Sequence, residues 1–442
     1  MAARTPTGSP YVALFRTGAF VRVFTAGLGS IAGSSIAGVC LIWIVFTRTG
    51  SAIDVALLGA SGIAAAVAFS AFGGTWVDRY DRRRLMVAAD FARAAAMAGI
   101  ALDLVVRGFD LIPILAAYFV VGAFSTVFNP AEQAIVPSLV EAPLVADANG
   151  LVRSSRSALQ FVGTAVAGAL IVTVGPLLGV VLNAATFLGS GLILLGMTLP
   201  AHLARPARAA GDRPGYFDDV KAGFRWLYRA RGFFQLTLSA MFFNFCAGII
   251  GTFLVIFATL VLHGSALVFA GLLAAEVAGQ GLGSLLVGPT HAVRWAGRAW
   301  VVPYGSASAV LALLLVLVPS VPVSIALVFG LGLLGGFAGT AWLTAAQLLV
   351  PTEMQGRYFG IDAFGSVAIL PAAQIGGALL IARYGIGATY LLTAIFWLGT
   401  GLLFLVPRAM WNLGYRGPQT PILRTDVDVA GTRGSLGGSR SG

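Results

Sequence analysis

Charged residues are scarce in this chain of 442 residues: Asp, Glu, Lys and Arg make up only 10% of it, whereas a soluble domain carries about 25%. Cysteine and histidine are scarcer still, with two and three copies. Cys40 and Cys246 fall inside apolar stretches, and no histidine has metal-ligand spacing, so neither a disulfide framework nor a metal site is expected. The Gly-x-x-x-x-Gly-Lys-Ser/Thr loop and the nucleophile elbow are both missing from the sequence, so ATP-driven or hydrolytic chemistry and a cofactor are not expected.

Long apolar stretches fill most of the chain, in which 58% of residues are hydrophobic. A bilayer crossing takes about 20 apolar residues, and strands would instead show alternating segments of about 10. The sequence therefore predicts an all-α polytopic membrane protein with twelve transmembrane helices. We place them at 20–46, 52–76, 85–105, 111–128, 153–175, 178–199, 234–262, 266–288, 299–318, 322–349, 359–382 and 386–406.

The net charge of +11 follows the pattern of a membrane protein rather than that of a nucleic-acid-binding protein. If the N-terminus is cytoplasmic, only Arg48, Arg107 and Arg383 fall in outer loops, and Arg93 falls within a crossing. This asymmetry obeys the positive-inside rule. The first apolar run is too long for a cleavable signal peptide and lacks a clear cleavage site. We therefore expect a cell-membrane protein with both termini in the cytoplasm, the lipid bilayer as its partner, and no nucleic acid.

A basic turn between the second and third crossings is the most specific motif. It runs from Gly74 to Arg84 as Gly-Thr-Trp-Val-Asp-Arg-Tyr-Asp-Arg-Arg-Arg. This turn resembles the Gly-x-x-x-Asp-Arg-x-x-Arg-Arg/Lys signature of the major facilitator superfamily of secondary transporters. One departure is Asp81, which stands where the family has a second glycine.

A short internal sequence repeat supports a chain built from two related halves. Gln133–Pro137 (Gln-Ala-Ile-Val-Pro) returns as Gln347–Pro351 (Gln-Leu-Leu-Val-Pro), 214 positions later. The prediction is two pseudo-symmetric six-helix bundles, the major facilitator fold. The expected divisions are a cytoplasmic segment at 1–19, bundles at 20–199 and 234–406, a linker at 200–233 and a disordered tail at 407–442. Helical spacing of Phe217, Val220, Phe224 and Leu227 predicts an interfacial amphipathic helix in the linker.

A second stretch indicates a branch of that family. Phe128–Pro137 and then Ala148-Asn149-Gly150 resemble the branch that holds siderophore exporters and macrolide or multidrug efflux pumps. Two departures weaken a proton antiport: Gly163 is followed by Thr164 instead of proline, and the fourth helix lacks the arginine usual in drug antiporters.

The resemblance implies a gate made of Gly74, Asp78, Arg79, Arg82, Arg83 and Glu132. In the family, the matched aspartate faces the start of the eleventh helix, and the arginines matched by Arg79 and Arg82 clamp to acids on neighbouring helices. Glu132 is the expected acid by position. The alternative is that the arginines only set topology, but topology does not require Asp78.

Glu276 is the clearest ionisable residue inside a predicted crossing. It lies about ten residues into the eighth crossing, or ~15 Å deep, with Gln280 one turn below on the same face. A carboxyl at this depth favours the neutral form, and one that alternates between neutral and charged forms can couple protons to transport. The alternative is a structural carboxyl bonded to a neighbouring helix.

Two further sets of residues are predicted. Asp90 and Arg93 share a helix face and should form a structural ion pair near the cytoplasmic end of the third crossing. The family lines its central cavity with helices one, four, seven and ten, which makes Trp43, Asn244 and Trp342, together with Gln280, the substrate-cavity candidates.

The leading hypothesis is a monomeric secondary transporter that exports a small amphipathic compound, such as a drug, siderophore or secondary metabolite, by proton-coupled alternating access. An aromatic and weakly polar cavity lining favours such a ligand. The alternatives are a metabolite or sugar importer of the same fold and, from another class, a transporter-like membrane sensor or an enzyme.

Overall fold

The computed structural model describes residues 10–197, 216–406 and 408–413; at 70–79, and at a few other helical positions, only the backbone is described. All regular structure in these ranges is helical. The first half contains α1 (Pro10–Arg16), α2 (Gly18–Thr49), α3 (Ala52–Arg79), α4 (Arg82–Val106), α5 (Leu111–Ile135), η1 (Val136–Ser138), η2 (Ala142–Leu144), α6 (Val145–Thr173) and α7 (Leu177–Leu195). The second half contains α9 (Arg231–Thr252), α10 (Leu254–Ile256), η3 (Phe257–Val261), α11 (Ala266–Leu286), η4 (Ala292–Trp295), α12 (Ala296–Ala299), η5 (Trp300–Ala307), α13 (Ser308–Leu317), α14 (Val321–Leu349), α15 (Thr352–Leu403) and α16 (Arg408–Trp411). The helix α8 (Tyr216–Arg229) precedes that second half.

The described helices account for twelve passes through a membrane. Ten are long and apolar enough to cross, and Tyr304–Leu317 forms a shorter apolar helix. The span Ala368–Leu403 contributes two passes, because the chain reverses inside α15 at Gly385, where φ is 80°. Only glycine adopts this left-handed conformation without a steric cost. The fold is therefore an all-α polytopic bundle, as the sequence predicts.

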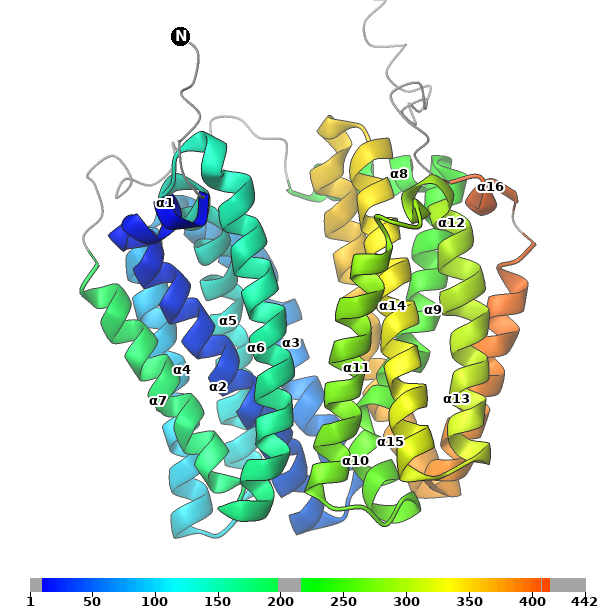
Figure 1. Ribbon diagram of the computed structural model, residues 1–442, viewed down its shortest axis with the longest axis horizontal. Helices are drawn as coiled ribbons and strands as arrows, with labels where there is room; N and C mark the ends of the chain where they lie inside the picture. The colour runs from blue at the N-terminus through cyan, green and yellow to red at the C-terminus, as the bar shows by residue number, and fades with distance from the viewer. Residues whose placement is uncertain (1–9, 198–215, 407, 414–442) are drawn as a thin grey trace, which may run out of the picture.

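The helices gather in two groups that stand side by side, α2 to α7 and α9 to α15 (Figure 1). The short helices α1 and α16 lie at the same end of the bundle, and so does α8. We call this end the terminal face and the other end the opposite face. Helices α2, α6 and α15 begin at the terminal face, and α3 and α11 end there (Figure 1).

The structure extends three helices beyond the predicted crossings. Helix α5 continues to Ile135, α6 begins at Val145 rather than 153, and α15 begins at Thr352 rather than 359. The sequence estimate followed apolar residues only, whereas a helix can continue past the apolar zone where its polar end packs on neighbours. Pro130 lies inside α5 without ending it.

The linker helix α8 packs on protein more than the sequence predicts. Leu227 is buried as expected, and Trp226 is buried with it against Phe233 and Tyr358, whereas Phe224 remains 53% exposed. The predicted apolar positions Phe217 and Val220 lie outside the described side chains. Residues 198–215 of the predicted linker also lie outside the described residues, as do 1–9, 407 and 414–442 of the predicted terminal segments.

Glycines hold α11 and α14 at backbone contact. Gly279 and Gly283 of α11 lie against the backbone of α14, and Gly332 and Gly336 of α14 lie against the backbone of α11. A Cβ at Gly283 would lie 2.8 Å from the backbone nitrogen of Phe337. Backbone cannot move aside as a flexible side chain can, so the four glycines form a tight seam.

We predict that Gly283→Val destabilises the protein by about 1–3 kcal/mol through overpacking of this seam. The matched control is Gly281→Val on the same helix, because a Cβ there meets nothing within 4 Å. Thermal unfolding of the purified variants measures the difference. Equal melting temperatures for the two variants would contradict the claim that α11 and α14 pack too closely at Gly283 to admit a side chain.

Candidate functional site

Contacts between the two halves lie near the opposite face. Gly168, toward the end of α6, packs on Ala270, near the start of α11. Trp43 of α2 stacks on Phe269 of α11 with ring centroids 6.4 Å apart. A third contact joins α3 and α15, where a Cβ at Gly59 would lie 2.6 Å from the Gln374 side-chain nitrogen. These contacts close the opposite face.

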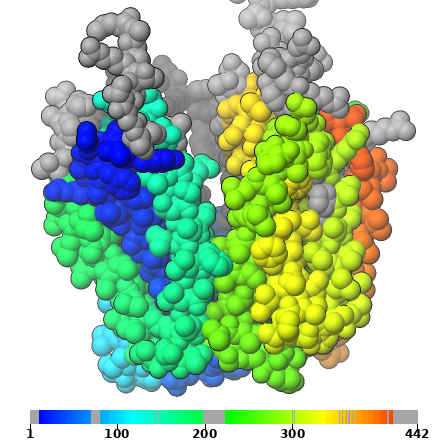
Figure 2. All heavy atoms as spheres, viewed as in Figure 1, coloured from blue at the N-terminus to red at the C-terminus, as the bar shows by residue number. Residues whose placement is uncertain are grey.

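A hollow separates the halves toward the terminal face (Figure 2). It lies between the beginning of α6 and the end of α11, the two helices that meet at the opposite face. The space between the halves is therefore accessible from one side. This geometry suits a protein that receives a molecule from one face of a membrane at a time.

A cavity of about 310 Å³ lies within the second half. Its lining comes from α9, α11, η5 and α14, and consists of Asn244, Gln280, Ser284, Trp300, Tyr304, Gly335, Gly336, Gly339 and Thr340. Two of these residues, Trp300 and Tyr304, stand on a π-helical segment, a geometry that is frequent at functional sites. The lining carries hydrogen-bonding groups but no charge.

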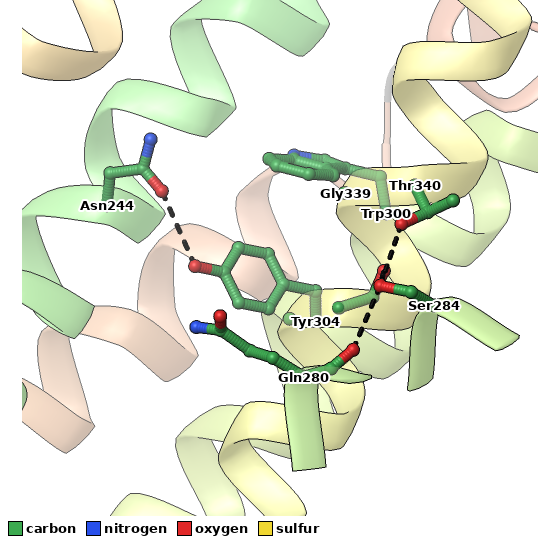
Figure 3. Close-up of a pocket in the computed structure, with 9 residues that line it drawn as sticks. Asn244, Gln280, Ser284, Trp300, Tyr304, Gly339 and Thr340 are labelled. Carbon is green, nitrogen blue, oxygen red and sulfur yellow. Dashed lines mark hydrogen bonds between the residues drawn. The ribbon is translucent and has the colours of Figure 1, made fainter. Parts of the chain in front are cut away.

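Hydrogen bonds organise the cavity wall (Figure 3). The Tyr304 hydroxyl donates to Asn244 Oδ1 at 3.4 Å, a long bond. The Thr340 hydroxyl donates to Ser284 Oγ at 2.9 Å, and Ser284 Oγ donates to the Gln280 carbonyl oxygen at 2.9 Å. The Gln280 side chain extends toward Tyr304, and no dashed line joins its amide to the residues drawn.

Glu276 lies one helical turn from Gln280, toward the opposite face. Its side chain is partly buried. The described residues give it no cationic partner and no side-chain hydrogen bond. The structure thus brings Glu276 close to the cavity wall, next to a residue that lines the cavity.

A buried ion pair occupies the first half. Arg93 Nη2 donates to Asp90 Oδ1, and the Ser190 hydroxyl donates to Asp90 Oδ2 at 2.6 Å. Asp90 is 0% exposed and Arg93 is 4% exposed. The Arg93 guanidinium also lies over the rings of Phe128 and Phe187, at 4.2 and 4.4 Å from their centroids. Cation–π contacts on both sides add to the attraction of the carboxylate.

Glu132 pairs with a cation that the sequence did not suggest. Arg156 Nη2 of α6 donates to Glu132 Oε2 at 2.6 Å, whereas the expected partner Arg82 donates to the Ala134 carbonyl oxygen at 3.0 Å. Arg83 Nε donates to the Leu194 carbonyl oxygen at 2.8 Å. Arg82 and Arg83 therefore bind the ends of α5 and α7, respectively, through backbone carbonyls.

The remaining gate residues are placed by their backbone alone. Gly74, Asp78 and Arg79 belong to the last turns of α3, and their side chains lie outside the described residues. Asp81 has a visible structural role, because its Oδ1 accepts a hydrogen bond from the Arg84 backbone nitrogen at 2.9 Å. It thus caps α4, which gives a physical reason for an aspartate in place of the family's glycine.

The four cavity candidates separate in space. Asn244 and Gln280 line the cavity in the second half. Trp43 lies at the contact between the halves, and Trp342 is 6% exposed within a cluster with Phe233 and Tyr358. The last two are therefore packing residues in this conformation.

The sequence prediction missed Arg156, Ser190 and Tyr304. Because α6 begins eight residues earlier than the predicted crossing, Arg156 lies well inside a helix and not at its end. With the correct start of α6, the position of Arg156 inside the helix would have marked it as a candidate functional residue. Tyr304 carries no charge, so composition alone gave no signal for it.

Comparison with known proteins matches this architecture. A family model described as Major Facilitator Superfamily matches residues 23–373. The multidrug efflux pump Tap of Mycobacterium tuberculosis is 27% identical over 426 residues, which covers 92% of this chain and 97% of that protein. Macrolide efflux protein A of Streptococcus pyogenes is 26% identical over 229 residues, 51% of this chain and 55% of that protein.

A solved structure has the same fold. The crystal structure of a mutant of the nucleoside transporter NupG superposes with a TM-score of 0.70 at 11% identity, covering 87% of this chain and 98% of the other. The family model spans most of the chain, and the relatives it resembles are transporters rather than enzymes. The chain is a multi-pass membrane transporter that belongs to the major facilitator superfamily.

Proposed function

We propose that this transporter exports small amphipathic compounds from the cytoplasm, driven by protons that enter as the substrate leaves. The observation that carries the proposal is the hollow between the halves, accessible from the terminal face and closed at the opposite face (Figure 2). The names of two relatives, a multidrug efflux pump and a macrolide efflux protein, favour export.

The proposed orientation places both termini and the terminal face in the cytoplasm of the cell. The basic residues Arg82, Arg83 and Arg84 and the linker cations Lys221, Arg225 and Arg229 lie at that face. Such clustering agrees with the positive-inside rule. In this orientation the hollow opens inward, ready to receive substrate. The two bundles, at 20–199 and 234–406, would then rock about their contacts as a monomer.

Glu276 is the proposed proton-coupling residue. A carboxyl without a cationic partner is more stable protonated when it is surrounded by protein, and more stable charged when water reaches it. Alternation of the hollow between the two faces changes that exposure. The carboxyl would therefore take up a proton in one conformation and release it in the other.

The substrate would bind between the halves and reach into the cavity at Asn244 and Gln280. That lining has amide and hydroxyl groups beside the aromatic rings of Trp300 and Tyr304. An uncharged polar group attached to an apolar body fits this chemistry best. The same hydrogen-bonding groups could also hold a polar metabolite, which keeps the importer as the second candidate.

Uptake of a fluorescent lipophilic cation by cells tests the direction and the coupling. Cells that express the protein should accumulate less dye than cells with empty vector, and a protonophore should abolish that difference. Faster accumulation than in the control would indicate import. If the dye level matched the control, direct flux of a neutral amphipathic probe, chloramphenicol, into inverted vesicles would decide; absence of flux there would refute the export proposal.

The basic turn and the Glu132–Arg156 pair would form the inner gate. We predict that Asp78→Asn slows maximal transport about tenfold without changing membrane insertion, because it removes a carboxylate but no cation from the positive-inside pattern. The measurement is initial flux per molecule in inverted vesicles. The control is Asp54→Asn at the opposite end of the same helix, which should transport normally. An unchanged transport rate for Asp78→Asn would show that Asp78 has no role in the gate.

A further inference from the structure

Helix α8, at the terminal face, packs on protein along one of its sides (Figure 1). Trp226 and Leu227 are buried there, and the Trp226 ring meets the Tyr358 ring of α15 with centroids 5.8 Å apart. Gly223 lies on the same side, where a Cβ would come 2.7 Å from Ile361 Cδ1. These contacts fix the rotation of α8 about its axis, so its other side is held in one direction.

The exposed side of α8 carries two rows of side chains. One row is aromatic, with Phe224 53% exposed and Tyr228 73% exposed. The other row is basic and consists of the exposed residues Lys221, Arg225 and Arg229. Residues three and four positions apart on a helix are neighbours, so the two rows run side by side. A row of rings beside a row of cations is typical of a helix that lies in the interface of a membrane.

The basic row is not neutralised by the described side chains. None of its three cations forms an ion pair within the described part of the chain. Asp218 and Asp219 stand nearer the start of α8, and their side chains lie outside the described residues. Arg231, the first residue of α9, is exposed as well. The segment 221–231 therefore carries four cations and no acid.

The aromatic row continues onto a membrane crossing. Tyr228 contacts Phe234 edge to face, with ring centroids 5.7 Å apart. Phe234 lies near the start of the apolar span Arg231–Val261 and is 39% exposed. The exposed side of α8 is thus next to the point where a crossing begins. Tyrosine is favoured at the headgroup level of a membrane, and the long stems of lysine and arginine reach its charged groups.

We propose that the exposed side of α8 binds the headgroups of anionic phospholipids. The aromatic row enters the boundary between headgroups and acyl chains, and the basic row contacts the phosphates of lipids that carry a net negative charge. Phosphatidylcholine offers the rings the same boundary but gives the cations no net charge. The basic row therefore provides the selectivity for anionic lipid, and the aromatic row anchors the helix. This binding does not depend on the direction of transport or on the substrate.

Amide hydrogen exchange of the segment 216–231 tests the proposal on the full-length protein in lipid nanodiscs. Discs of phosphatidylcholine alone are compared with discs of phosphatidylcholine and phosphatidylglycerol in equal parts. Phosphatidylglycerol should slow the exchange of this segment at least about tenfold, because α8 must release the headgroups before it opens. Each variant is compared with itself in the two discs, so differences in intrinsic exchange rate cancel. Equal wild-type rates in the two discs would overturn the proposal.

A charge variant and a matched control locate the effect on α8. The charge variant replaces the basic row: Lys221→Gln, Arg225→Gln and Arg229→Gln. The control makes the same change in net charge at three exposed cations on other elements of the terminal face: Arg16→Gln, Arg153→Gln and Arg294→Gln. The effect of phosphatidylglycerol should fall to about twofold or less in the charge variant and persist in the control. Equal losses in both would mean that the general charge of the terminal face attracts the lipid, and would overturn the proposal.

The aromatic row is tested by Phe224→Ala/Tyr228→Ala. Exchange of the segment should become faster in both discs, because the rings meet the same boundary under either headgroup. Alanine favours a helix more than phenylalanine or tyrosine does, so a loss of helix propensity cannot cause the faster exchange. Unchanged rates in both discs would contradict the insertion of the rings into the membrane.

Glycerol phosphate separates a lipid surface from a site for free anions, because it has the headgroup chemistry without the acyl chains. Added in excess to the phosphatidylcholine discs, it should leave the exchange of the segment unchanged. If it slowed exchange as much as phosphatidylglycerol does, the occupant would be a soluble anion and the proposal would be wrong.

Discussion

Glu276→Gln is expected to reduce proton-driven transport to about a tenth of the wild-type rate or less, with the protein still folded and inserted. Glutamine has almost the same shape as protonated glutamate but cannot bind or release a proton. The described residues give Glu276 no ion-pair partner, so the substitution leaves no cation unpaired. Transport in response to an imposed pH gradient, measured in proteoliposomes, gives the rate.

Facilitated exchange provides the internal control. Substrate exchange without a proton gradient should survive Glu276→Gln, because the hollow and its lining remain. Glu141→Gln removes an exposed carboxylate outside the crossings and should change neither activity. Gradient-driven transport by Glu276→Gln at the wild-type rate would contradict the proposed role of this carboxyl.

Arg93→Met is expected to destabilise the protein by about 3–5 kcal/mol, because it leaves the carboxylate of Asp90 buried without its cation. Both side chains are almost fully enclosed, and two phenyl rings surround the guanidinium. The Ser190 hydroxyl alone cannot offset a full charge. Chemical denaturation in detergent, followed by tryptophan fluorescence, measures the loss.

The double variant Asp90→Leu/Arg93→Met separates the unpaired charge from lost packing. Removing both charges should recover most of the stability, since apolar residues of similar volume can replace a buried pair at little cost. Equal destabilisation of the single and double variants would show that packing of the arginine, rather than its charge, stabilises this region.

Much of the fold could be predicted from the sequence because membrane crossing leaves a strong signal. An apolar run of fixed length has few alternatives in a bilayer, and backbone groups there must bond within helices. The Gln133–Pro137 and Gln347–Pro351 echo marks the ends of α5 and α14, which occupy equivalent places in the two halves. The pairing of Asp90 with Arg93 could also be predicted from the sequence, because residues three positions apart on a helix lie on the same face.

The partners between helices could not be predicted in the same way. Arg156 of α6 binds Glu132 of α5, and no sequence spacing relates these positions. Trp342 looked like a cavity residue by helix assignment alone, but its rotation about α14 directs it into an aromatic cluster. Helix rotation depends on packing between neighbours, and the apolar faces of membrane helices resemble one another whether they meet lipid or protein.

Alternating access of the hollow is the central claim, and paired spin-label distances test it most directly. One pair joins Ser154 of α6 to Leu285 of α11 near the terminal face, and the other joins Val172 to Leu267 near the opposite face; all four residues are exposed. The native cysteines Cys40 and Cys246 are buried, so labels should attach to the introduced sites. Between high and low pH, the account predicts that one distance shortens while the other lengthens. Distances that stay fixed at both faces, in protein shown to transport, would contradict it.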